Sequence, residues 1–207
     1  MALTLDADDR SGALADPAAI ARRHTLLSEP HMQPLADYVR ALRTRGIGYV
    51  PDFDPLDGGV RARLLLLLEK PGPKTFPPTG SGFVSRNTND PTARAIHQFM
   101  LQAEVPRRET VLWNIVPWWN GVIAMTAAEK CLGAAEVPAL LARLPELRGV
   151  ILAGNAAWEL GAAQFRDAGL PLFRCVHPSP QARAGPASSE RWLQLPQIWR
   201  EAWRAVA

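Results

Sequence analysis

Five consecutive leucines, Leu64–Leu68, constrain the fold of this chain more than any other feature. A strand with one face in water alternates apolar and polar residues, so this uninterrupted run predicts a strand over 63–69 that is covered on both faces. Strands of that kind belong to parallel sheets with helices on both sides. Three further short apolar runs, at 110–115, 149–154 and 170–176, predict three more strands of the same sheet.

Segments with helical periodicity separate these four runs. Strands that alternate with helices indicate parallel pairing and right-handed crossovers. The predicted fold class is therefore α/β: a three-layer α/β/α arrangement with a central four-stranded parallel sheet. The predicted helices cover 17–28, 31–45, 91–104, 126–132, 136–146, 155–168 and 188–205.

A chain of 207 residues is long enough for one domain of this kind and short for two. We predict a single domain over 16–207, because Asp16 followed by Pro17 has the residues of a helix cap and a first helical turn. Residues 1–15 are expected to form a flexible tail. Their acidic character is unlike a signal peptide, and no apolar run approaches the ~20 residues that span a bilayer. We therefore expect a cytoplasmic monomer without membrane contact.

The charge and the cysteine content exclude some kinds of site. The formal net charge of +3 is a mild basic excess, which tolerates a polyanionic partner without requiring one. Two cysteines that form no CxxC pair, with four scattered histidines, cannot build a four-cysteine iron–sulfur or zinc site. We predict neither a metal nor a cofactor.

A rigid turn, His177-Pro178-Ser179-Pro180, follows the predicted strand at 170–176. Two prolines around a serine cannot continue a strand, so the chain must break there. His177 is thereby held at the carboxyl edge of the sheet, where open α/β sheets bind their ligands. Two other predicted strands end in chemically unusual residues, in Glu69-Lys70-Pro71-Gly72-Pro73 and around Asn114. The candidate site therefore lies at this edge.

These segments together resemble the uracil-DNA glycosylase superfamily. The Pro71-Gly72-Pro73 turn, Phe83 followed by Val-Ser, Asn114 and the His177-Pro-Ser-Pro tetrapeptide match it in order and spacing over about 60–185, most of the chain. The resemblance is closest to bacterial families, although their cluster-binding cysteines are missing here. It implies a three-layer α/β/α fold and a DNA repair enzyme that hydrolyses the N-glycosidic bond of uracil. The partner would be uracil-containing DNA, single- or double-stranded.

The resemblance also implies roles for individual residues. His177 would donate a hydrogen bond to uracil O2, where negative charge develops as the base leaves. Asn114 would read uracil O4 and N3 together, and Phe83 would stack on the flipped base. Two structural alternatives stay open: Asn114 joins two strand ends, and Phe83 anchors a loop. Besides Asn114 and Phe83, the expected substrate-binding residues are Pro71 and Gly72. The expected DNA-binding residues are Lys74, Ser179, Gln181 and Arg183.

The residue that activates water is not fixed by this pattern. The largest family of the superfamily has Asp before the first-motif proline and other families have Asn, whereas this chain has Lys70, which cannot be a general base when protonated. Asp90 and Asn89 are the first candidates to replace it, and Glu69 is the third. Asp90 before Pro91 fits an ordinary helix N-cap equally well. Attack by the Lys70 amine on the sugar is a further alternative.

A second departure concerns the residue after the His177 tetrapeptide. A leucine that fills the hole left by the flipped base often follows there, and here the residue is Gln181. Gln181 or Arg183 would then contact the opposite base or a phosphate. Two rival functions remain open: a glycosylase for another deaminated base such as hypoxanthine or xanthine, and a non-catalytic DNA-binding relative.

Overall fold

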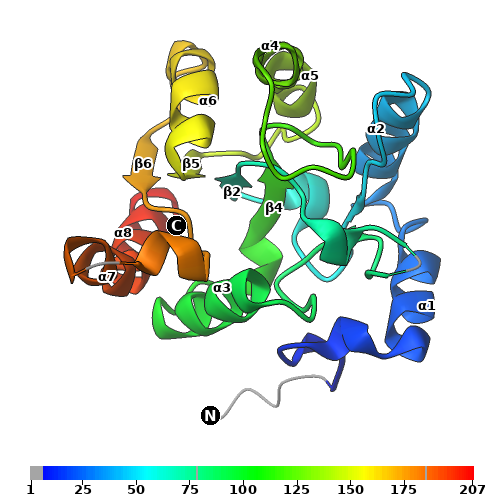
Figure 1. Cartoon of the computed structure of the whole chain (residues 1–207), viewed down its shortest axis with the longest axis horizontal. Coiled ribbons are helices and arrows are strands. Elements are labelled where there is room, and N and C mark those ends of the chain that lie inside the picture. The colour runs from blue at the N-terminus through cyan, green and yellow to red at the C-terminus, as the bar shows by residue number, and fades with distance from the viewer. Residues whose placement is uncertain (1–6, 78, 185) are drawn as a thin grey trace.

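A four-stranded parallel sheet, in the order β4-β2-β5-β6, forms the centre of the molecule. The computed structural model describes residues 7–77, 79–184 and 186–207 (Figure 1). The sheet confirms the α/β class that was predicted from the sequence. Its strands are β2 (Leu64–Leu68), β4 (Thr110–Asn114), β5 (Gly149–Ala153) and β6 (Leu172–Cys175).

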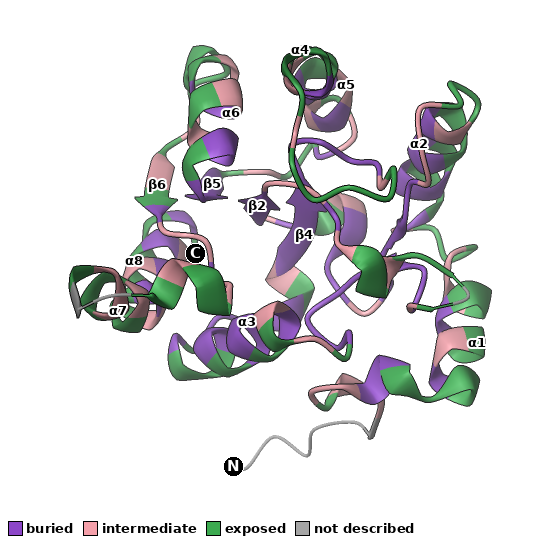
Figure 2. Ribbon diagram, viewed as in Figure 1, coloured by how far each residue is buried: buried purple, intermediate pink, exposed green. Residues whose placement is uncertain are grey.

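Strand β2 lies inside the sheet and pairs in parallel with a neighbour on each side. Leu64 is in register with both Thr110 and Gly149, and Leu68 is in register with Asn114. Because strands flank β2 and helices cover both of its faces, all five leucines are buried. Figure 2 shows this burial across β2, β4 and β5. The uninterrupted apolar run in the sequence results from this central position, which is covered on both faces.

Helices cover both faces of the sheet, as the three-layer arrangement requires (Figure 1). One layer consists of α4 (Ala127–Ala135), α5 (Val137–Leu141) and α6 (Asn155–Asp167). The opposite layer consists of α3 (Pro91–Gln102), α7 (Pro186–Leu193) and α8 (Leu195–Val206). Two further helices, α1 (Pro17–Leu26) and α2 (Gln33–Arg43), lie beyond the β4 edge. None of the helices within the described residues is long and apolar enough to cross a membrane.

The C-terminal helix differs from the single helix expected at 188–205. The chain forms α7 and α8 instead, with Gln194 between them. Pro196 lies in the first turn of α8, where its missing N–H costs nothing. In one continuous helix Pro196 would clash with the carbonyl group four residues earlier, so the break at Gln194 follows from this proline.

A small parallel pair of strands, β1 (Asp52–Phe53) and β3 (Phe83–Val84), lies outside the main sheet. The sequence patterns placed both segments in loops. Each strand is only two residues long, and its pairing joins Asp52 to Phe83 across a long stretch of chain. Pairing of that kind leaves no local periodicity from which it could be predicted.

The N-terminal segment differs from the expected flexible tail of 1–15. Ala13 and Leu14 are buried, and the Leu14 N–H donates to the Asn87 carbonyl oxygen at 3.1 Å. Asp9 forms ion pairs with Arg86 and Arg107. Because of this burial, the backbone hydrogen bond and the ion pairs, residues 8–15 pack as part of the domain, while residues 1–6 lie outside the described residues.

A buried network of arginines and aspartates holds this segment in place. The Arg107 guanidinium donates to Asp54 at 2.6 Å and to Asp57 at 2.9 Å, and it also pairs with Asp9. Arg23, which is fully buried, donates to the other Asp54 oxygen at 2.9 Å. Burial raises the pKa of Asp57 to about 7. Burial also opposes ionisation of Asp54, but Arg107 and Arg23 outweigh it and hold the Asp54 pKa below its usual value.

Replacing Arg107 by methionine should lower the free energy of unfolding by about 3–5 kcal/mol, because the substitution leaves buried carboxylates without their partner. Urea unfolding at neutral pH measures this. The matched control is Arg40→Met, which removes an exposed ion pair with Asp37 and should change the free energy by less than ~1 kcal/mol. Equal effects of the two substitutions would contradict a stabilising role for the network.

Candidate functional site

Three polar side chains lie at the carboxyl edge of the sheet, at or just after the ends of three strands. Asn114 is the last residue of β4, Glu69 follows β2 directly, and His177 lies two residues beyond the end of β6. All four strands are parallel, so their carboxyl ends share one edge. β4 and β6 are the two outer strands, about three strand spacings or ~14 Å apart. Glu69 starts from the strand next to β4, between the other two residues.

The His177 imidazole is fixed as a neutral hydrogen-bond donor. The Ser179 backbone N–H donates to His177 Nδ1 at 3.2 Å, across the proline-braced turn. A ring nitrogen that accepts a hydrogen bond carries no proton, so the proton of the neutral ring is assigned to Nε2. Burial lowers the pKa of His177 below 6.5, and the charge of Glu69 opposes this shift in part. His177 can therefore offer an Nε2–H group to a ligand.

The Glu69 carboxylate is held at the start of α6. Its Oε1 accepts a hydrogen bond from the Ala156 backbone N–H at 2.9 Å. Gly154 makes room for this arrangement, because a Cβ there would lie 2.5 Å from Glu69 Oε1. Gly154 also has φ of +105°, a conformation that glycine tolerates. No hydrogen bond engages Glu69 Oε2 within the part of the chain that the structure describes, so this oxygen can take a water molecule.

Lys70 turns away from Glu69 and has a structural role. Its Nζ donates to Glu129 Oε1 at 2.7 Å and to Asn120 Oδ1 at 2.9 Å. The side chains of Lys70 and Glu129 are only 4% and 8% exposed. Glu69 contacts α6 instead, so the two neighbouring residues have different partners. The amine proposed above as a possible nucleophile is thus committed to a buried ion pair.

Asn114 has a free amide at the end of β4. The residue is buried, yet within the described residues its side chain makes no hydrogen bond. The structural alternative, in which its amide joins two strand ends, therefore has no hydrogen bond to support it. Of the expected substrate contacts, Pro71 is buried and Gly72 is partly exposed. An added Cβ at Gly72 would meet no atom within 4 Å, so this turn borders open space.

Phe83 is not available to stack on a ligand, contrary to the prediction. Its side chain is 0% exposed and packs with Leu14 and Ala19 in a second apolar cluster. Its ring centroid lies 4.7 Å from that of His24 on α1. The structure thus agrees with the other interpretation of Phe83, an anchor for the loop that leads to α3.

Asp90 is the N-cap of α3, which was the alternative to a catalytic role. Its Oδ1 accepts a hydrogen bond from the Ala93 N–H at 3.0 Å. Burial raises the pKa of Asp90, and the hydrogen bonds from the helix oppose the shift. Asn89 beside it is exposed. Asp90 therefore begins α3, and Asn89 directly precedes it. Among the described residues, no hydrogen bond or ion pair joins either one to Glu69 or His177.

The expected DNA-binding residues lie in the loops of the same edge. Ser179 contributes its backbone N–H to the bond with His177. Gln181 and Arg183 are exposed on the short helix Pro180–Arg183, and the Arg183 guanidinium lies 5.2 Å from the centre of the Trp192 ring. Lys74 is exposed on the short helix Pro73–Thr75. Three of these side chains therefore remain accessible to a partner.

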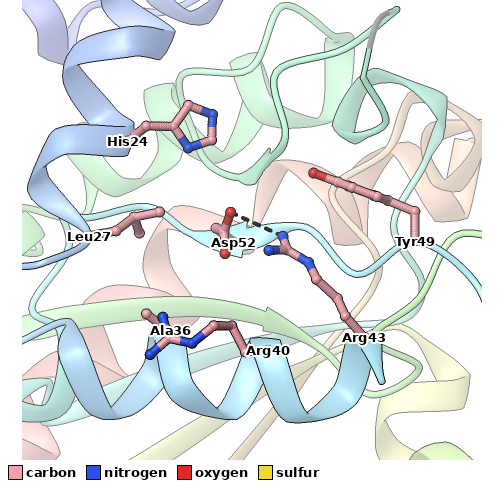
Figure 3. Close-up of a pocket in the computed structure, with 7 residues that line it drawn as sticks. All are labelled: His24, Leu27, Ala36, Arg40, Arg43, Tyr49 and Asp52. Carbon is pink, nitrogen blue, oxygen red and sulfur yellow. Dashed lines mark ion pairs between the residues drawn. The ribbon is translucent and has the colours of Figure 1, made fainter. Parts of the chain in front are cut away.

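A separate pocket of about 420 Å³ lies between α1, α2 and β1 (Figure 3). Inside it, Arg43 forms an ion pair with Asp52 at 3.0 Å, and its guanidinium lies 5.4 Å from the centre of the Tyr49 ring. The pocket contains none of the residues predicted for the site. Its lining residues are His24, Leu27, Ala36, Arg40, Arg43, Tyr49 and Asp52.

The chemistry of the site follows from its own residues. Comparisons with protein-family models and with curated proteins find no match for this chain. Over residues 7–77, 79–184 and 186–207, no group of three or more His, Cys, Asp or Glu side chains could hold a metal ion. The carboxyl edge offers a neutral imidazole N–H, a carboxylate with one free oxygen and an unpaired amide. Such a set can stabilise a leaving anion and place a water molecule.

Replacing Glu69 by glutamine should lower the pKa of His177 further, because the Glu69 charge raises it in the native protein. An NMR titration of the imidazole nitrogens measures the shift and identifies the protonated nitrogen. Glu159→Gln is the control, since Glu159 is an exposed residue of α6. An unchanged or higher His177 pKa in Glu69→Gln would show that the two side chains do not interact.

Proposed function

We propose that this protein is a DNA glycosylase that hydrolyses the N-glycosidic bond of uracil in DNA and leaves an abasic site. One observation carries the proposal: a neutral His177 and the Glu69 carboxylate lie together at the carboxyl edge of the sheet. Cleavage of an N-glycosidic bond produces an anionic base and a sugar with oxocarbenium character. A neutral donor and a carboxylate match these two developing charges.

His177 acts on the leaving base. As the bond to the sugar lengthens, negative charge grows on uracil O2, and a fixed donor stabilises that charge more than it stabilises the substrate. The bond from Ser179 N–H to His177 Nδ1 keeps the proton on Nε2. The proline residues on either side of Ser179 keep the turn rigid, so little reorganisation is needed when the charge forms.

Glu69 acts on the sugar and the water. Its Oε1 is held by the Ala156 N–H, which fixes the carboxylate plane, and Oε2 is free to orient a water molecule. The negative charge also stabilises the oxocarbenium character of the sugar. Glu69, ranked third from the sequence, is therefore our first candidate for water activation, ahead of Asp90, whose Oδ1 caps α3.

Asn114 selects the base. Uracil presents an acceptor at O4 and a donor at N3, and one amide group can pair with both. Cytosine presents the opposite pattern, so an amide held in the orientation that pairs with uracil would leave buried polar groups unpaired on cytosine. The burial of Asn114 and its lack of a protein partner support this role. A purine read by the same amide is the alternative, which a hypoxanthine substrate tests directly.

The substrate nucleotide has to leave the base stack to reach this edge. Lys74 and Arg183, both exposed, are the candidates to contact its flanking phosphates. The non-catalytic alternative rested on Lys70 in the position of the usual acid. That lysine pairs with Glu129, and the adjacent Glu69 supplies a carboxylate, so the argument for an inactive relative is weakened.

Single-turnover release of uracil from an oligonucleotide, followed by alkaline cleavage, tests the proposal. His177→Ala should lose ~10²–10³ in rate, the worth of one donor to a developing anion. Glu69→Gln should lose ~10²–10⁴, the worth of a general base. Asp90→Asn should lose far less, because an amide oxygen can still cap α3.

Three outcomes would change the assignment. A wild-type protein that leaves uracil intact but releases hypoxanthine would change the substrate, and one that releases neither base would contradict the proposed function. A large loss in Asp90→Asn with an active Glu69→Gln would move water activation to Asp90. A borohydride-trapped DNA adduct that disappears in Lys70→Ala would make the lysine a nucleophile.

Substituting Asn114 tests base selection separately from catalysis. Asn114→Asp replaces the amide donor by an acceptor, so uracil release should fall about tenfold or more and the ratio of cytosine to uracil release should rise. Asn114→Ala should also slow uracil release, without favouring cytosine. If both variants fold, as judged by circular dichroism, and release uracil at the wild-type rate, Asn114 does not select the base.

A further inference from the structure

The loop between β4 and α4 exposes the most accessible large apolar side chain among the described residues. Ile123 is 76% exposed, and its neighbour Val122 is 55% exposed. Gly121 before them has φ of +90°, a backbone conformation that favours glycine, and an added Cβ there would meet nothing within 4 Å. Figure 2 shows this loop as exposed. Two adjacent β-branched side chains therefore project into solvent from the tip of a turn.

The base of this loop is firmly anchored. Lys70 Nζ donates to Asn120 Oδ1 and, at 3.4 Å, to the Ala124 carbonyl oxygen, so one ammonium group holds both sides of the tip. Glu129 Oε1 accepts from Lys70 and, at 3.0 Å, from Asn120 Nδ2. Thr126 and Glu129 then cap α4 reciprocally. A fixed base with an exposed apolar tip is unlike a loop that merely lacks core contacts.

The anchor also ties the tip to the candidate site. Lys70 is the residue after Glu69, and the loop begins a few residues after Asn114. The tip therefore projects from the same edge at which Glu69 and Asn114 are placed. Exposed cations occupy other loops of this edge, among them Lys74 and Arg183. An apolar tip that shares this edge with basic side chains fits the stacked bases and the phosphates of a nucleic acid.

We propose that Val122 and Ile123 form an apolar wedge that enters the base stack of duplex DNA when the target nucleotide leaves it. This inference rests on the proposed function. Proteins that kink DNA insert apolar side chains such as isoleucine or leucine between base steps. Gln181 occupies the position after the His177 tetrapeptide where a wedge leucine often stands, but its side chain is polar. β-Branched side chains on an anchored loop lose little conformational freedom on insertion, which favours them as a wedge.

The double variant Val122→Ala/Ile123→Ala tests the wedge on two kinds of substrate. The ratio of single-turnover uracil release from duplex to release from single-stranded DNA should fall about tenfold or more, because the wedge offsets the cost of unstacking a base step, which only the duplex requires. The ratio isolates the wedge from general losses of activity. Leu101→Ala is the matched control: Leu101 is 46% exposed on α3, which lies in the helix layer opposite to α4, and its loss should leave the ratio unchanged.

A second measurement does not depend on base release. A duplex with 2-aminopurine beside a non-cleavable 2′-fluoro-deoxyuridine should brighten when the wild-type protein unstacks it, and should stay dim with the double variant. Absence of brightening with the wild-type protein, or equal brightening with both proteins, overturns the wedge. An equal loss of excision on the two substrates also overturns it. If the wild-type protein releases no uracil, the proposed function fails, and brightening that requires Val122 and Ile123 still supports the wedge.

One further outcome assigns the loop to a different partner. Sedimentation of the wild-type protein and the double variant without DNA shows whether the tip joins two copies of the chain. A wild-type dimer that the double substitution converts to a monomer would identify an interface between copies and would overturn the wedge. Equal sedimentation of the two proteins is the expected result.

Discussion

The fixed position of β2 is the constraint on which the rest of the structure depends. This strand has a parallel neighbour on each side and helices on both faces, so a shift of its register would break two ladders at once. Its last paired leucine, Leu68, therefore sets where the chain leaves the sheet. The next two residues, Glu69 and Lys70, then contact different segments of the chain. One reaches α6 and the other reaches the loop before α4.

A network of buried charges fixes the N-terminal segment and the loop before α3. Arg107 and Arg23 share Asp54, and Asp9 brings the N-terminal segment into the same network. Each of these groups would be costly to bury alone, so the segments that carry them are held in a single arrangement. The network binds the residues before α1 to the loop that leads to α3.

The sequence predicts the strands because continuous burial leaves a continuous apolar run, and it predicts the turn at His177 because proline restricts the backbone locally. It does not predict the burial of Phe83, whose ring partner His24 lies in a different helix. It also does not rank Glu69 correctly. Glu69 and Lys70 are neighbours in the sequence, and only the fold shows that Glu69 interacts with His177 while Lys70 pairs with Glu129. Contacts between distant segments decide both points.

The fit between Gly154 and Glu69 constrains how this edge can vary. The glutamate carboxylate occupies the volume that a Cβ at position 154 would need. The two positions are thus coupled, and homologous sequences with a side chain at 154 are expected to carry a shorter acid at 69 or none. Covariation of these two columns in a future alignment would follow from steric exclusion alone. The absence of a side chain at Gly154 therefore determines how long the acidic side chain at position 69 can be, although the two positions are more than eighty residues apart.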